Sequence, residues 1–186
     1  MKRLDARLCE VIDKIAKIAR ESIMGKETDN LALFDKVQDK GIELYVMKND
    51  KYDGVSMWNK KTHKPQIYLD VDQNQNRQLF TLAHELGHLF IDLGWYPNSR
   101  LEEEPKETVL SVNYRDKDKE RDTEDDKERI ANQFAGAFLM PQSEVEKIIS
   151  SEMTDEEKKQ EISRKFKVTL KAAENRLLVL GVLNAD

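Results

Sequence analysis

One stretch of sequence decides the fold of this chain, namely Gln78-Leu-Phe-Thr-Leu-Ala-His-Glu-Leu-Gly-His88. Apolar residues recur here every three or four positions, and this period predicts an amphipathic helix from about Arg77 to Leu93. The apolar side of that helix consists of Leu79, Leu82, Ala83, Leu86, Leu89, Phe90 and Leu93. Because His84, Glu85 and His88 fall on the other side, they are outside the core stripe and available for chemistry.

The two histidines of this helix have the spacing of a metal site. Residues four apart on a helix are separated by about 40° of rotation and about 6 Å of rise, so the imidazoles of His84 and His88 can converge on one ion. Glu85 follows the first histidine, where its carboxylate can reach a water held by the metal rather than the metal itself. The stretch therefore predicts a zinc site, with Glu85 as the general base of a hydrolytic reaction.

Catalytic zinc usually has three protein ligands, so the sequence must supply a third. The extended motif with a further histidine six residues on is excluded, because residue 94 is glycine. Asp92 lies one turn beyond His88, but its short side chain favours a supporting contact or an exposed position. We rank Glu128 as the better candidate, above the loop residues Glu102, Glu103 and Glu104.

Glu128 begins a second small-residue segment, Glu128-Arg-Ile-Ala-Asn-Gln-Phe-Ala135, within a helix predicted from about Thr123 to Leu139. Small side chains here, together with Gly87 on the first helix, indicate that the two helices lie close together. Glycine in a helix interior costs about 1 kcal/mol relative to alanine, and close contact would account for it. Asn132, one turn after Glu128, is placed to accept the outer N–H of a ligating histidine.

The remaining periodicities predict an α+β chain. Helices are expected at Leu4 to Ile23 and Asn30 to Asp39, then three short strands at Ile42 to Met47, Gly54 to Trp58 and Gln66 to Val71. We expect these strands to form a small antiparallel sheet. Two capping-box spacings, Ser143 to Glu146 and Thr154 to Glu157, and a last helix from Thr169 to Leu180 complete the mainly helical remainder.

Charge and cysteine content narrow the class of protein. The net charge of −5 is carried by the stretch from Glu102 to Arg129, which holds twelve acidic and seven basic residues. With Pro97 and Pro105 nearby, we interpret residues of about 97–122 as a charged surface insertion or flap. The single Cys9, the absence of a signal peptide pattern and the lack of a membrane-length apolar segment favour a soluble, cytoplasmic protein.

Within residues 154–183, the range through which DNA binding is possible, the segment from Glu161 to Val182 has the look of a helix, a tight turn and a second helix, with Lys165, Lys167, Lys171 and Arg176 as its positive contacts. The residues from Thr154 onward, however, include seven basic and six acidic side chains, so their charges nearly balance. They also contain no aromatic stacking platform. A packing or substrate-docking role is therefore favoured over direct DNA binding.

The segment from Gln78 to His88, followed by Glu128 to Pro141, resembles the ImmA/IrrE-type metallo-endopeptidases. The resemblance extends over about residues 30–183. It implies a zincin-like domain with the HExxH motif on a central helix, His84, His88 and Glu128 as zinc ligands, and Glu85 as catalytic base. It also implies a protein substrate, a helix-turn-helix transcriptional repressor whose cleavage relieves repression.

We accordingly divide the chain into a zincin-like domain at residues 1–141 and a helical, helix-turn-helix-like subdomain at residues 142–186. The predicted function is zinc-dependent cleavage of such a repressor. The alternative is a non-proteolytic regulatory protein that binds a repressor or DNA and uses its metal for structure. Tyr96 and Tyr114 are candidates for stabilising the oxyanion, although no spacing places either near the metal.

Overall fold

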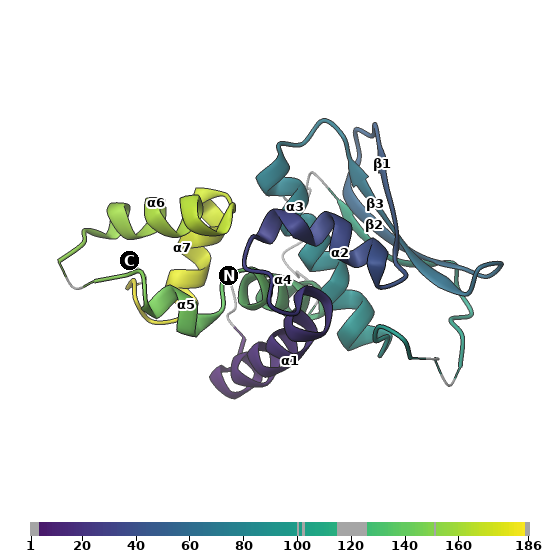
Figure 1. Ribbon diagram of the computed structural model, residues 1–186, viewed down its shortest axis with the longest axis horizontal. Helices are drawn as coiled ribbons and strands as arrows, with labels where there is room; N and C mark the ends of the chain where they lie inside the picture. The colour runs from purple at the N-terminus through teal and green to yellow at the C-terminus, as the bar shows by residue number, and fades with distance from the viewer. Residues whose placement is uncertain (1–3, 100, 102, 115–125, 151, 185–186) are drawn as a thin grey trace.

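The computed structural model describes residues 4–99, 101, 103–114, 126–150 and 152–184 (Figure 1). In these residues the elements are α1 (Ala6–Met24), the 3-10 turn η1 (Asn30–Ala32), α2 (Leu33–Asp39), β1 (Glu43–Met47), β2 (Tyr52–Asn59), β3 (Lys64–Asp70), α3 (Gln75–Gly87), the π-helical turn η2 (His88–Asp92), β4 (Val109–Tyr114), α4 (Asp126–Leu139), α5 (Gln142–Glu146), α6 (Asp155–Phe166) and α7 (Leu170–Val179). The predicted α+β class is confirmed. The expected helix start at Thr123 lies outside the described residues.

The sheet differs from the prediction in two ways. Its strand order is β1-β3-β2-β4, and β1 runs parallel to β3, so the sheet is mixed rather than antiparallel. The β2–β3 hairpin is antiparallel as expected, but β3 enters between β1 and β2. Burial gives the reason, because β3 buries Ile67 and Leu69 in the core, whereas the outer half of β1 is exposed and suits an edge.

The fourth strand, β4, comes from the segment that we interpreted as a charged insertion. It pairs antiparallel with β2, so at least part of this segment belongs to the sheet. The strand alternates apolar and polar residues only from Leu110 to Tyr114 and is preceded by four glutamates and one lysine. Because the surrounding residues are charged, the short period-two pattern was not interpreted as a strand. Pairing with β2 stabilises it as one.

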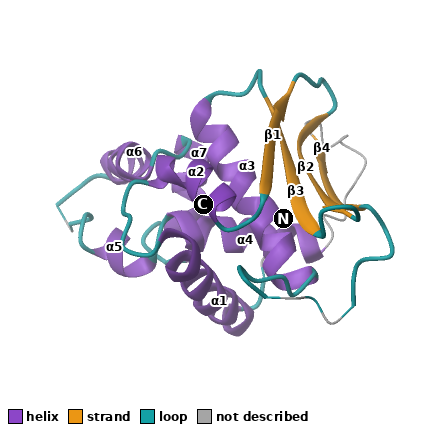
Figure 2. Ribbon diagram, turned by 45° about the vertical axis from the view of Figure 1, so that its right-hand side comes forward, coloured by secondary structure: helices purple, strands orange, loops and turns teal. Residues whose placement is uncertain are grey.

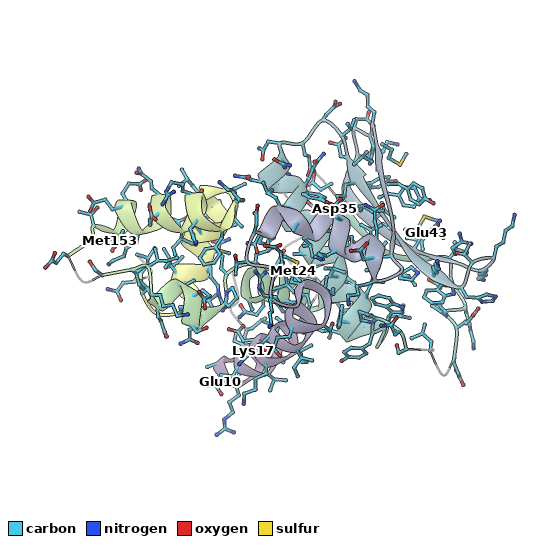
Figure 3. The ribbon with its side chains drawn as sticks, viewed as in Figure 1. Glu10, Lys17, Met24, Asp35, Glu43 and Met153 are labelled. Atoms are coloured by element: carbon cyan, nitrogen blue, oxygen red, sulfur yellow. The ribbon has the colours of Figure 1, made fainter. Side chains whose placement is uncertain are left out.

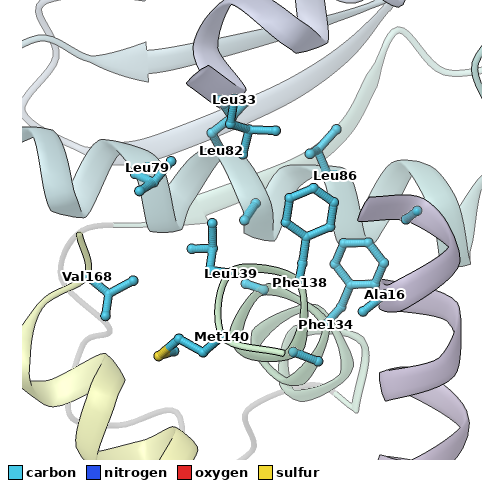
Figure 4. Close-up of a cluster of buried hydrophobic side chains, with 14 of the residues drawn as sticks. Ala16, Leu33, Leu79, Leu82, Leu86, Phe134, Phe138, Leu139, Met140 and Val168 are labelled. Carbon is cyan, nitrogen blue, oxygen red and sulfur yellow. The ribbon is translucent and has the colours of Figure 1, made fainter. Parts of the chain in front are cut away.

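The helices lie together on one side of the sheet (Figure 2). Helix α3 is central, since it contacts β2 and β3 on one side and α4 on the other. The core that surrounds it is shown in Figure 4, where the labelled side chains are Leu79, Leu82 and Leu86 of α3, Phe134, Phe138, Leu139 and Met140 of the α4 region, Ala16, Leu33 and Val168. Each of these is fully buried. This packing holds the motif helix from both sides.

Helix α1 packs against α4 and buries Ile12, Ala16 and Ile23, while Glu10 and Lys17 project to solvent (Figure 3). Asp5 caps its first turn by accepting a hydrogen bond from the Arg7 amide. The stripe predicted from the sequence is only partly buried, because Leu8, Val11 and Ile18 are exposed.

The C-terminal helices contact the rest of the chain through buried polar groups. Arg176 of α7, expected among the positive contacts for DNA, is 3% exposed, donates to the Met140 carbonyl and pairs with Asp13 of α1. It therefore serves packing. The capping box of Thr154 and Glu157 is confirmed, but the one predicted at Ser143 is wrong, because α5 begins directly after Pro141 without a side-chain cap. Among the described residues, no helix is long and apolar enough to traverse a bilayer.

Candidate metal centre

Helix α3 presents His84 and His88 side by side in the interior. Asn74 caps its first turn by accepting a hydrogen bond from the Arg77 amide, which fixes where the helix begins. The exposed fractions of His84 and His88 are 1% and 5%, and their Nε2 atoms lie 3.1 Å apart. Two imidazole nitrogens thus point at the same small volume.

Glu128, at the start of α4, brings its carboxylate to the same volume. Glu128 Oε2 lies 3.4 Å from His84 Nε2, and Oε1 lies 3.3 Å from His88 Nε2. In the described residues these three side chains form the one group whose donor atoms could hold a metal ion. Of the loop candidates, Glu103 is exposed, Glu104 pairs with the exposed His63, and Glu102 lies outside the described residues.

The close approach of α3 and α4 is what allows ligands from both helices to meet. A Cβ atom at Gly87 would lie 3.2 Å from the Cα atom of Ala131 and 3.2 Å from Cδ1 of Phe134, inside ordinary contact distance. The interpretation of Gly87 as a close-contact residue is confirmed. Its missing side chain lets α4 bring Glu128 within reach of the histidines.

Both histidines are oriented from their outer nitrogens. His84 Nδ1 lies 3.0 Å from Asn132 Oδ1, as predicted for Asn132, and His88 Nδ1 lies 2.8 Å from Asp92 Oδ2. Asp92 reaches His88 through the π-helical turn η2, in which the Leu93 amide bonds to the His88 carbonyl. Such outer partners fix the ring so that Nε2 faces the metal, and π-helical turns often occur at functional sites.

Charge interactions and hydrogen bonds couple His88 and Glu128 in the metal-free state. Burial alone would lower the pKa of His88, but hydrogen bonds to Asp92 and Glu128 outweigh it and raise that pKa to about 10. Burial alone would raise the pKa of Glu128, but the two histidines outweigh it and lower that pKa well below its usual range. The carboxylates thus favour positive charge on His88, and a metal cation could supply that charge instead.

Three distances between donor atoms of this group are close to the separation of two ligands on a tetrahedral ion. Ligand atoms held about 2.0–2.1 Å from a tetrahedral zinc lie about 3.3 Å from one another. In the structure the two Nε2 atoms lie 3.1 Å apart, and each lies near a different oxygen of the Glu128 carboxylate, at 3.4 Å for His84 and 3.3 Å for His88. The donor set of two imidazoles and one carboxylate therefore suits a divalent metal ion.

Glu85 is buried beside this centre but turns toward the sheet. Its side chain is 0% exposed, and its Oε2 atom accepts a hydrogen bond from Ser111 Oγ of β4. Its Oε1 atom is buried and has no hydrogen-bond partner among the described residues. A buried carboxylate oxygen left unbonded is costly, so this atom marks a place for a polar group such as a water molecule.

Ser111 and its neighbour Ser56 were not identified from the sequence. Ser56 Oγ lies 2.7 Å from Ser111 Oγ, which extends the polar contact of Glu85 into β2. The signal that would have found Ser111 is the period-two pattern of residues 109–114. Of the two oxyanion candidates, Tyr96 packs its ring against Phe90 at 5.0 Å and is 41% exposed. The side chain of Tyr114 lies outside the described residues.

Together the HExxH motif, the downstream glutamate and the metal-ligand geometry of these three residues indicate a metallopeptidase-like protein. The Peptidase_M78 family model, described as the IrrE N-terminal-like domain, matches residues 37–178. The chain therefore belongs to this family, as its resemblance to the ImmA/IrrE-type proteins predicted. A comparison with curated proteins found no match.

Proposed function

We propose that this protein is a zinc-dependent endopeptidase. The observation that carries the proposal is the convergence of His84, His88 and Glu128, which bring one donor atom each within 4.8 Å of one another. Two histidines and one carboxylate are a usual ligand set of catalytic zinc, whereas structural zinc sites usually have four protein ligands. The three-ligand set therefore favours catalysis over a purely structural metal.

A zinc ion bound here would act as a Lewis acid toward the peptide carbonyl and lower the pKa of water at the site to about 7. Glu85 would supply the acid–base chemistry. Its unbonded Oε1 accepts the proton of the attacking water and then donates that proton to the leaving amine. The products are one carboxylate and one amine, and Glu85 returns to its starting state.

Asp92 and Asn132 support the reaction indirectly. Each accepts the outer N–H of one histidine, which keeps both Nε2 lone pairs directed at the metal position. Gly87 keeps α4, and with it Glu128, at the required separation. These three residues would hold the ligands in place before any metal binds.

As substrate we propose a helix-turn-helix transcriptional repressor, cleaved in the cytoplasm. Support comes from the resemblance of the two motif blocks to repressor-cleaving ImmA/IrrE-type proteins and from membership of the IrrE N-terminal-like family. The free Cys9 fits a reducing compartment. We propose residues 142–186 as a helical subdomain that packs on the catalytic domain and contributes to substrate docking.

The test is cleavage of purified helix-turn-helix repressors from the same genome, followed by intact-mass analysis. Wild-type protein loaded with zinc should cut one of them at a single site. Glu85→Gln should bind the same amount of zinc and cut none, whereas Glu103→Gln, the same change at an exposed position, should behave as wild type. Undiminished cleavage by Glu85→Gln would overturn the proposed mechanism.

Absence of cleavage by the wild-type protein across the whole panel would overturn the proposed substrate. If wild type and Glu85→Gln both relieve repression in cells without cutting the repressor, the protein acts by binding. That result would support the non-proteolytic alternative.

A further inference from the structure

Strand β4 places a hydroxyl group against the carboxylate of the HExxH motif. Ser111 Oγ donates a hydrogen bond to Glu85 Oε2, and Ser56 Oγ lies 2.7 Å from Ser111 Oγ. Because the hydroxyl proton of Ser111 is directed at Glu85, Ser56 must be the donor within the serine pair. A chain of two hydrogen bonds thus runs from β2 through β4 to α3.

The two ends of this chain are buried, and Ser111 between them is partly buried. The exposed fractions of Ser56 and Glu85 are both 0%. Gly54 on β2 leaves the room that Glu85 needs, since a Cβ atom there would lie 3.1 Å from Glu85 Oε1 and 2.5 Å from Thr81 Cγ2. Glu85 is therefore enclosed by the sheet on one side and, within the part of the chain that the structure describes, held by a single side-chain donor.

The pairing of β2 with β4 directs Ser111 at the helix. Ser56 and Ser111 are register partners, and the ladder shifts register on either side of the regular stretch that contains them, between Tyr52 and Gly54 and again between Ser56 and Met57. Register irregularities of this kind re-aim side chains next to functional sites. They fix the Ser111 hydroxyl relative to α3 by backbone pairing rather than by a flexible side chain.

We propose that Ser111 is a positioning residue for Glu85. Its hydrogen bond engages Oε2 and leaves Oε1 as the oxygen that exchanges protons with water and leaving amine. This role rests on the proposed endopeptidase function. It also gives the charged segment that contains β4 a part in the reaction, because without that strand the base has no hydrogen-bond donor among the described residues.

A carboxylate needs such a restraint because its terminal torsion is soft and its two oxygens exchange by rotation. A donor fixed on Oε2 removes that freedom before the reaction begins. When Oε1 takes up the proton, Oε2 remains an acceptor, so the bond to Ser111 persists throughout the cycle. The orientation of Glu85 is then the same when it accepts the proton and when it releases it.

The experiment compares Ser111→Ala, Ser111→Thr and the control Val112→Thr, which changes the next residue of the same strand on its other face. Each zinc-loaded variant is assayed for zinc content and for kcat and KM on the repressor that the wild type cleaves. Ser111→Ala should keep zinc content and KM but lose about 10- to 100-fold in kcat, the range expected when a catalytic group is displaced by up to about 1 Å. Ser111→Thr retains the hydroxyl and should recover most of that loss.

A crystal structure of Ser111→Ala is the second readout, and it does not depend on activity. We expect the Glu85 carboxylate to rotate or shift from its wild-type position, with His84 and His88 unmoved. An unmoved carboxylate, or wild-type kcat in Ser111→Ala, would overturn the positioning role while leaving the endopeptidase proposal intact. If the wild type cleaves no repressor, the proposed substrate is overturned instead, and the crystal structure still decides whether Ser111 positions Glu85.

Discussion

Replacing Gly87 by alanine tests the helix contact on which the metal centre depends. The added Cβ atom would lie 3.2 Å from both Ala131 Cα and Phe134 Cδ1, closer than ordinary contact, and one of these neighbours is backbone. Alanine gains about 1 kcal/mol over glycine as a helix former, but overpacking a core costs about 1–3 kcal/mol. We therefore expect the variant to range from unchanged to about 2 kcal/mol less stable.

Gly136→Ala is the matched control, because Gly136 lies within α4 and its added Cβ would sit 3.7 Å from Arg176 Cδ, an ordinary contact. This variant should gain up to about 1 kcal/mol from helix propensity alone. The two variants should thus differ by about 1–3 kcal/mol in free energy of unfolding.

The assay is urea unfolding of both variants in the presence of a chelator, since bound metal would add stability by mass action. In the same proteins, zinc affinity should fall for Gly87→Ala, because α4 must move away with Glu128 and Asn132, and should hold for Gly136→Ala. Equal stabilisation by the two substitutions would refute the close-contact reasoning.

Three further outcomes are expected. Asp92→Ala and Asn132→Ala should each lower zinc affinity by about 10- to 100-fold, because each leaves one histidine ring unrestrained. The affinity is measured by competition with a chromophoric chelator, and unchanged affinity in both variants would contradict their orienting role. Arg176→Ala should lower the free energy of unfolding by on the order of 3 kcal/mol, measured by thermal unfolding; this is the low end for a buried ion pair, because the side chain of Asp13 is 24% exposed. A loss below about 1 kcal/mol would contradict a stabilising role of this ion pair. The pKa of His88 in metal-free protein is raised from 6.5 to about 10, so its contribution to stability is complete below pH 6.5 and is lost as pH rises toward 10. Urea titrations with chelator should show that decline, and a flat profile would contradict it.

Local sequence patterns were sufficient to predict the helices that carry the site. The 3.6-residue period around His84 and His88 predicted α3, and the spacing alone placed both imidazoles on one face. The small residues of α4 and Gly87 indicated the close helix contact that the structure contains. These features depend on neighbours one or two turns apart, which a sequence displays directly.

Features that depend on pairing between distant segments could not be predicted. The partner of β1 depends on which strand takes the inner position of the sheet, with a neighbour on each side. The short strands carry no sequence signal that distinguishes β2 from β3 for that position. The same holds for β4, whose partner β2 lies about 50 residues earlier in the chain. Ser111 was missed for this reason, although it bonds directly to Glu85. The capping box at Ser143 failed because Pro141 already sets the start of α5.

The π-helical end of α3 was also beyond the sequence pattern. A regular helix was expected to continue to Leu93, but from His88 the chain takes a wider turn. Asp92 was ranked as a supporting residue because of its short side chain, and the wider turn brings its carboxylate within 2.8 Å of His88 Nδ1. The prediction about its role was sound, whereas the backbone geometry that permits it came from tertiary packing.

The central claim, a metal centre formed by His84, His88 and Glu128, is tested most directly by zinc content after gel filtration. Wild-type protein and Glu103→Ala should retain about one zinc per chain, and Glu128→Ala should lose it, because removal of the third ligand leaves an incomplete site. Full zinc retention by Glu128→Ala would contradict the assignment and redirect the search to Asp92.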